Sequence, residues 1–148
     1  NNGDTFGEEA LISSNKRNAT VTMLSNGTLN RLSKDDFIEL LNEPLLDWLS
    51  YEDAQKLIIE ENAAWLDVRL PAEHQTDAIN SSLHIPLIFL RMKIDTLNQD
   101  TPYIVYCDTG RRSSAAAFLL NERGFNTYIL KDGISSVPEE IRTSQDSA

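Results

Sequence analysis

From about Leu46 onwards, short apolar runs typical of strands alternate with stretches typical of helices. The strand candidates are AAWLDV, LHIPL, PYIVYC and NTYIL, at residues 63–68, 83–87, 102–107 and 126–130. The helix candidates are residues 51–62, 90–97 and 112–124, the first with apolar side chains at helical spacing. Ser50 suits the N-cap of the first helix, and Gly124 suits the end of the last. Strands separated by helices pair in parallel, so the pattern predicts an α/β fold, a parallel sheet flanked by helices.

The first 45 residues have a different pattern. NATVTML and LNRL read as two strands around Asn26-Gly27, a pair that suits a tight hairpin turn. Ser33 suits the N-cap of a following helix, KDDFIELL, and Pro44 suits its end. We therefore expect a short β-hairpin and a helix in residues 1–45, a main domain in 46–138, and a flexible polar tail in 139–148.

Composition narrows the possible functions. The chain has 148 residues and a net charge of -10, which argues against nucleic acid or an anionic membrane as partner. No apolar run is long enough to span a bilayer, and the polar, acidic start is not a secretory signal. One cysteine and two histidines are too few for a metal site without help from carboxylates. We expect a cytoplasmic protein without metal or cofactor, in which the lone thiol is either inert core filling or a reagent.

Cys107 lies where a predicted strand meets a predicted helix, which is where parallel sheets bind ligands. We expect the residues after it to curl tightly at Gly110 and to point backbone N–H groups inward, at the positive end of the helix dipole. Arg111 and Arg112 add two positive charges. These effects favour the thiolate, which is the nucleophilic form of cysteine. A lone cysteine at a strand end is by itself more typical of an inert core residue. The joint pattern of Cys, Gly, Arg and helix start favours a reactive one.

The loop CDTGRRS at residues 107–113 resembles the active-site loop of rhodanese domains, which reads C-x-x-G-x-R-S. WLDVRLPAEH resembles that family's L-D-V-R-x-x-x-E motif, SLHIPL its N-I-P strand, and LNERGFNTYILKDGI its glycine-containing end. The resemblance covers residues 48–137 or so. TDAINSS stands where the family has GHIPGA, so we expect a reshaped approach to the site.

The resemblance implies a thiosulfate or persulfide sulfurtransferase. Cys107 would take the outer sulfur of a small donor as a persulfide and pass it to a thiol or to cyanide. The implied substrate-binding loop is Asp108, Thr109, Gly110, Arg111, Arg112 and Ser113, and the implied supporting residues are Asp67, Arg69 and Glu73. Arg69 is expected to be structural, whereas Arg112 either binds substrate or braces the loop through Asp67 or Glu73.

Two other functions can be considered for this loop. The domain could sense or dock a sulfurated partner and turn over poorly. A tyrosine phosphatase is disfavoured, because phosphatases place one more residue between the cysteine and the arginine than Cys107 and Arg112 allow.

FGEEAL and RNATV, near the N-terminus, resemble the phosphate-binding cassette of cyclic nucleotide-binding domains. The resemblance implies contacts from Gly7, Glu8, Arg17, Asn18 and Ala19, with Glu8 on the ribose and Arg17 on the cyclic phosphate. The barrel strands that precede this cassette in that family are missing. We therefore interpret residues 1–45 as a remnant of such a β-barrel that does not bind tightly alone. We expect cyclic nucleotide to regulate the full-length protein, and the open strand edges of the remnant to favour a dimer.

Overall fold

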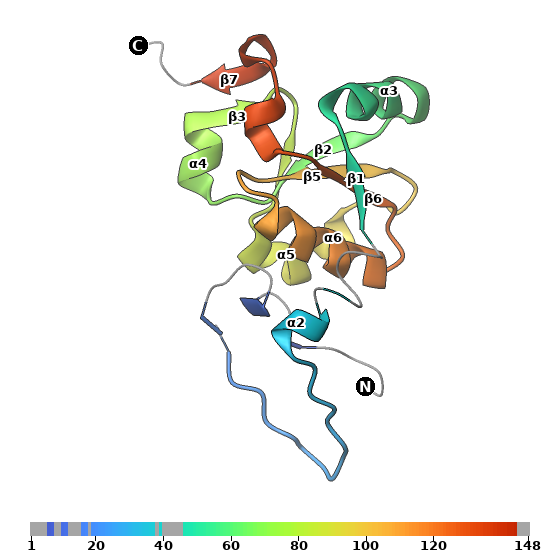
Figure 1. Cartoon of the computed structure of the whole chain (residues 1–148), viewed down its shortest axis with the longest axis vertical. Coiled ribbons are helices and arrows are strands. Elements are labelled where there is room, and N and C mark those ends of the chain that lie inside the picture. The colour runs from blue at the N-terminus through green and yellow to red at the C-terminus, as the bar shows by residue number, and fades with distance from the viewer. Residues whose placement is uncertain are drawn as a thin grey trace.

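The computed structural model describes residues 6–7, 10–11, 16–17, 19–37, 39 and 46–144. Within these residues the main body is a five-stranded parallel sheet with helices on both faces (Figure 1). Its strands, in spatial order, are β1 (Asp47–Leu49), β6 (Thr127–Leu130), β5 (Tyr103–Tyr106), β2 (Ala64–Asp67) and β4 (Leu83–His84). The helices of this body are α3 (Tyr51–Glu61), α4 (Pro71–Thr76), α5 (Leu87–Lys93) and α6 (Arg111–Glu122), with 3-10 turns η2 (Ile94–Thr96), η3 (Gly133–Ser136) and η4 (Glu139–Ile141).

The central strand β5 is buried on both faces. Val105 points into the apolar cluster beneath α5 and α6, whereas Ile104 points into the cluster beneath α3. Figure 1 shows α5 and α6 on one side of the sheet and α3 on the other. Burial on both faces explains why β5 reads as a continuous apolar run rather than as an alternating one. The strand therefore delivers the residue that follows it, Cys107, to the middle of the carboxyl edge of the sheet.

Most elements predicted for the main domain are confirmed. The predicted strands at 63–68, 102–107 and 126–130 are β2, β5 and β6. Ser50 caps α3, because its side chain accepts a hydrogen bond from the Asp53 N–H at 3.1 Å. Gly124 follows α6 with φ +83°, the left-handed conformation expected of a glycine that ends a helix. LHIPL forms only the two-residue strand β4, and the helix predicted at residues 90–97 begins earlier than expected, at Leu87.

The region from Pro71 to Ile79 and the end of the chain hold elements that the sequence did not predict. β3 (Asp77–Ile79) pairs antiparallel with β7 (Arg142–Ser144), and Arg142 Nη1 lies 2.9 Å from Asp77 Oδ2. The prediction of a flexible tail is therefore wrong for residues 139–144. The edge of β3 gives the polar end of the chain a strand to pair with, and a charge pair fixes it there. Residues 145–148 lie outside the described residues.

The hairpin predicted around Asn26-Gly27 is also wrong. Residues 19–33 form no strand, their side chains are exposed, and neither residue of the pair has a positive φ. Two short strands that join no larger sheet bury too little apolar surface to be stable, which is the physical reason for the failure. The dimer expected through strand edges of residues 1–45 stays a prediction.

The N-terminal segment nevertheless contacts the main domain. Ser33 caps the short helix α2 (Lys34–Phe37) as expected, with its Oγ 3.2 Å from the Asp36 N. Phe37 is buried, and its ring packs edge-on against Phe118 of α6 with the centroids 5.2 Å apart. Apart from residue 39, the rest of the helix predicted after Phe37 lies outside the described residues. Nowhere in the described part of the chain is a helix both long and apolar enough to cross a membrane.

Candidate active site

Cys107 comes directly after the central strand β5, and its side chain is fully buried. Its Sγ accepts a hydrogen bond from the Gly110 N–H at 3.1 Å and lies 3.4 Å from Ser113 Oγ. Both partners belong to the loop that becomes the first turn of α6. The sulfur is therefore held at the N-terminus of a 12-residue helix, where the helix dipole favours negative charge.

The loop turns at Gly110, which is the N-cap of α6 and has φ +86°. A side chain there would be strained, and its Cβ would lie 3.1 Å from the ring of Trp48. The expectation that successive loop N–H groups all face the sulfur is wrong for Thr109. Its N–H donates to Asp108 Oδ1 at 2.8 Å instead. Short acceptor side chains of this kind commonly capture a nearby backbone N–H, so the anion cradle is smaller than predicted.

Arg112 braces the loop. Its two terminal nitrogens donate to the two carboxylate oxygens of Glu73 at 2.7 Å each, and Nη2 also donates to Asp108 Oδ1 at 2.9 Å. The hydrogen bonds from Arg112 hold the pKa of Glu73 below its ordinary value, and the pairing with Glu73 raises the pKa of Arg112. Of the two alternatives from the sequence, the geometry supports bracing, and the brace runs to Glu73 rather than to Asp67.

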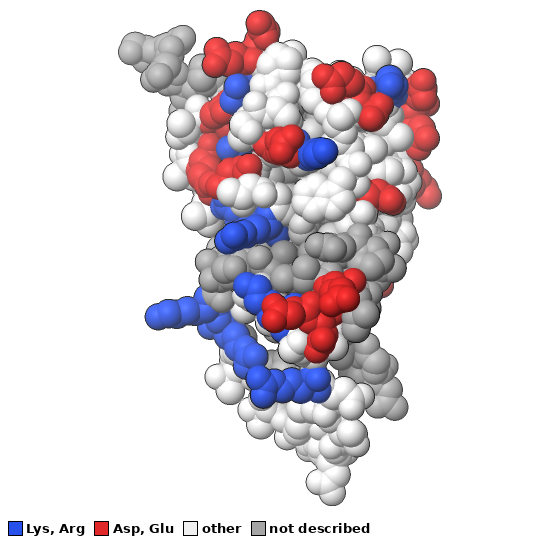
Figure 2. Space-filling view, in the orientation of Figure 1, with Lys and Arg blue, Asp and Glu red and all other residues white. Residues whose placement is uncertain are grey.

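Arg111 lies in a different environment from Arg112. Its side chain is exposed, and no hydrogen bond or ion pair joins it to another residue in the described part of the chain. Its charge is therefore free for a ligand anion beside the loop. Figure 2 shows that acidic side chains gather over the part of the molecule that holds α3 and α4. Basic side chains follow the N-terminal segment, beside a second acidic group.

Asp67 and Arg69 form a buried pair at the carboxyl end of β2. The Arg69 guanidinium donates to both Asp67 oxygens, with Nη2 2.7 Å from Oδ2, and also to the Asp77 carbonyl at 2.5 Å. Burial raises the pKa of Asp67, but the hydrogen bonds from Arg69 and His74 outweigh it, so that this pKa lies below its ordinary value. Every strong contact of Arg69 is internal, which supports the structural role expected for it.

Two histidines beside this pair were not among the predicted site residues. The rings of His74 and His84 stack with centroids 4.1 Å apart. His74 Nδ1 lies 2.9 Å from Asp67 Oδ2, and His84 Nε2 lies 3.0 Å from the Arg69 carbonyl oxygen. The available signal was that His84 stands where the resembling motif, N-I-P, has asparagine.

Gly133 was also not among the predicted site residues, although it lies in the motif LNERGFNTYILKDGI. Its φ is +58°, and a Cβ there would lie 2.5 Å from the Asp108 carbonyl oxygen and closer still to that of Cys107. This close approach lets the Ile134 N–H donate to the Cys107 carbonyl at 2.9 Å. The segment after β6 therefore fixes the backbone of the loop at Cys107 and Asp108, and only glycine fits.

The residues implied for a cyclic nucleotide are only partly described by the structure. Gly7, Arg17 and Ala19 are exposed, and Glu8 and Asn18 lie outside the described residues. Nor do the described residues bring together three or more His, Cys, Asp or Glu side chains that could hold a metal ion.

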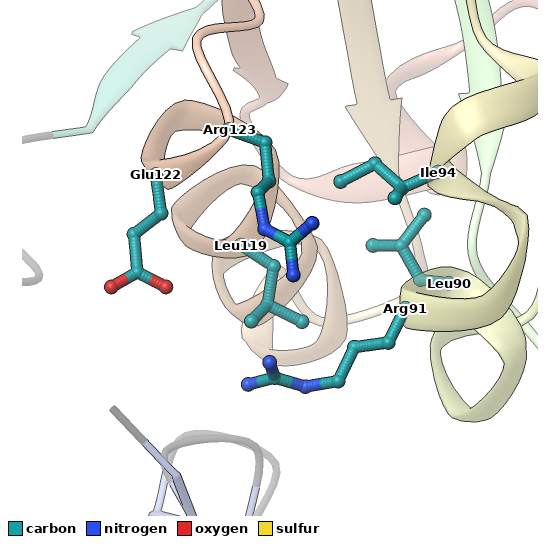
Figure 3. Close-up of a pocket in the computed structure, with 6 residues that line it drawn as sticks. All are labelled: Leu90, Arg91, Ile94, Leu119, Glu122 and Arg123. Atoms are coloured by element: carbon teal, nitrogen blue, oxygen red, sulfur yellow. The ribbon is translucent and has the colours of Figure 1, made fainter. Parts of the chain in front are cut away.

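A small hollow between α5 and α6 is separate from the cysteine (Figure 3). Its apolar floor is Leu90, Ile94 and Leu119, and its charged rim is Arg91, Glu122 and Arg123. The rim residues Glu122 and Arg123 lie at the C-terminal end of α6, about 18 Å along the helix from the loop. The hollow therefore plays no part in the geometry around Cys107.

Comparison with known proteins places this arrangement among sulfur-transfer domains. Residues 50–140 match the model of the family described as Rhodanese-like domain. The chain is 33% identical over 75 residues to the thiosulfate sulfurtransferase PspE of Escherichia coli, covering 49% of this chain and 72% of that protein. It is also 33% identical over 95 residues to a tRNA sulfurtransferase of Tolumonas auensis. That match covers 62% of this chain but only 19% of that protein. A rhodanese-related protein from Thermoplasma volcanium shares the fold with a TM-score of 0.58 and 35% identity, over 64% of this chain and 92% of that one.

Proposed function

Because this chain belongs to the rhodanese-like domain family, we propose that it is a sulfurtransferase that carries sulfur as a persulfide on Cys107. One observation carries the proposal. The only cysteine of the chain ends the central strand and takes an N–H hydrogen bond from Gly110, at the start of α6. A thiolate at this position is stabilised by the hydrogen bond and by the helix dipole, which makes it a nucleophile rather than a packing residue.

The reaction proceeds in two displacements. The Cys107 thiolate attacks the outer sulfur of thiosulfate; the new Sγ–S bond forms, the S–S bond of the donor breaks, and its electron pair leaves with sulfite. An acceptor thiolate or cyanide then attacks the outer sulfur of the persulfide, and Cys107 leaves as a thiolate. Charge is conserved in both steps, and no external oxidant or reductant is needed.

The two arginines of the loop have different roles in this reaction. Arg111 holds the oxyanion of the donor, because its guanidinium is exposed and is not committed to another described residue. Arg112 binds no substrate but holds Asp108 and Glu73 in place. The name of the Escherichia coli relative makes thiosulfate the first donor to test. The net charge of -10 makes a small thiol a better acceptor than a nucleic acid, and a reducing cytoplasm would keep the single thiol available.

A second function has one observation in its favour. Cys107 is 0% exposed, so a donor reaches the sulfur only if loop atoms move aside. Such a domain would turn over slowly and act as a sulfur-sensing or docking module. Thiosulfate:cyanide turnover separates the two functions. We expect measurable turnover that is abolished in Cys107→Ser. Wild-type turnover no higher than background would favour the docking module, and appreciable turnover that Cys107→Ser retains would contradict both functions.

Regulation by cyclic nucleotide remains a further proposal for the full-length protein. It rests first on the sequence match at Gly7, Arg17 and Ala19. It rests also on the packing of Phe37 against α6, because α6 begins at the loop that holds Cys107. Calorimetry with cyclic AMP and cyclic GMP tests it. We expect no tight binding by these 148 residues and binding by a longer protein that includes a complete barrel. Absence of binding in that longer protein would contradict the proposal.

A further inference from the structure

Ser113 lies between the sulfur and a backbone carbonyl. Its Oγ is 3.4 Å from Cys107 Sγ and 3.1 Å from the Gly110 carbonyl oxygen. A hydroxyl carries a single proton, so it donates to only one of these two acceptors at a time. Ser113 and Cys107 are both fully buried, so water is not at hand to satisfy whichever acceptor is left.

The Gly110 carbonyl oxygen has more donors than it needs. It accepts from the Ser114 N–H at 2.9 Å and from Ser114 Oγ at 2.5 Å, in addition to Ser113 Oγ. A carbonyl oxygen has two lone pairs, and the Ser113 contact is the longest of the three. Ser114 therefore satisfies the carbonyl alone, and the proton of Ser113 is free to turn away without leaving a buried acceptor unpaired.

We propose that Ser113 is a catalytic residue whose hydroxyl changes its hydrogen-bond partner with the charge on Cys107. While Cys107 is a thiol, its S–H donates to Ser113 Oγ, whose own proton points at the Gly110 carbonyl. When Cys107 loses its proton, the hydroxyl rotates and donates to the sulfur. The anion then has two donors, the Gly110 N–H and the Ser113 hydroxyl. The S–H bond breaks when the thiol gives its proton to solvent, and the rotation of the hydroxyl makes or breaks no further covalent bond.

The position of the charges explains why a hydroxyl is needed. Arg112 is paired with Glu73 and Asp108, and these carboxylates largely cancel its electrostatic effect on the sulfur. A buried anion without water depends on the donors that touch it. This inference rests on the proposed function for its second step, in which Cys107 leaves as a thiolate and needs the Ser113 donor again.

Alkylation of the single cysteine by iodoacetamide measures this effect without sulfur transfer. The measured quantity is the ratio of alkylation rates at about pH 9 and about pH 6.5, which rises when the thiolate is less favoured. We expect Ser113→Ala to raise this ratio by up to about fivefold, the factor for one lost hydrogen bond of about 1 kcal/mol. Ser114→Ala is the matched control, since it removes a hydroxyl from the next buried residue but touches no sulfur, and the Ser114 backbone N–H still satisfies the Gly110 carbonyl. We expect the control to change the ratio less than about twofold.

An equal change in both variants, or no change in Ser113→Ala, would overturn the proposal. If Ser113→Ala does not fold, Ser113→Thr and Ser113→Val replace it, because they match in shape and differ by the hydroxyl. Thr should keep the wild-type ratio and Val should raise it; equal ratios would again overturn the proposal. Failure of thiosulfate to load sulfur on the wild-type protein would contradict the proposed function but would leave this comparison intact.

Discussion

Arg111 and Arg112 are adjacent in sequence and opposite in environment, which allows one pair of substitutions to separate substrate binding from stability. Arg112→Ala removes three hydrogen bonds to Glu73 and Asp108, whereas Arg111→Ala removes an exposed side chain without a partner in the described structure. Each variant deletes one positive charge beside the same loop.

The magnitude follows from the exposure of the partners. The side chain of Arg112 is 19% exposed and that of Glu73 is 34% exposed, so the pair lies between a surface ion pair and a buried one. Breaking it should lower the free energy of unfolding by about 1.5–3 kcal/mol, more than an exposed pair and less than a fully buried one. In a domain of this size that corresponds to a fall in Tm of roughly 6–15 °C. Arg111→Ala should change the free energy by less than about 0.5 kcal/mol.

Urea unfolding followed by tryptophan fluorescence gives the free energies, and thiosulfate:cyanide kinetics give the substrate effect. We expect Arg111→Ala to raise the KM for thiosulfate with the unfolding midpoint unchanged. We expect Arg112→Ala to lower the midpoint. The division of roles would be refuted if the two variants lost equal stability, or if Arg111→Ala left the KM unchanged.

Two further predictions concern the framework of the loop. The pKa of Glu73 is held below its ordinary value by Arg112, so the pair stabilises the fold above about pH 4.3 and this contribution is lost as pH falls through the lower folded pKa. The free energy of unfolding should therefore fall less steeply between about pH 5 and pH 3 in Arg112→Ala than in the wild type; parallel pH profiles would show that the pair is not coupled to folding. Gly133→Ala should lower the free energy of unfolding by more than about 3 kcal/mol, because its Cβ would overlap two carbonyl oxygens of the loop. Gly124→Ala, with a positive φ but open space, should lower it by only about 1 kcal/mol, and similar losses would contradict the close approach.

The sequence predicts the part of the molecule in which local pattern and burial agree. β5 is buried on both faces and so reads as an apolar run, and the cysteine, the glycine and the helix start all follow it within five residues. The partner of Arg112 could not be chosen in advance, since Glu73 lies 39 residues away and reaches it only through the packing of α4. The stacking of His74 on His84 likewise depends on tertiary structure and has no local signal.

The errors have a common cause. The strands expected around Asn26-Gly27 had the right local residues but no sheet to join, and the polar tail had a sheet edge that the sequence did not reveal. Pairing partners decide whether a short strand forms, and they are set by the fold rather than by the segment. The same reasoning explains why the short edge strand β1 was missed.

The most direct test of the central claim is the intact mass of the protein after incubation with thiosulfate. The wild-type protein should gain the mass of one sulfur atom on Cys107 and lose it when a thiol is added. Cys107→Ser should gain nothing while keeping the wild-type fold. A wild-type protein that gains no sulfur, or a Cys107→Ser protein that does, would contradict the assignment of Cys107 as the sulfur carrier.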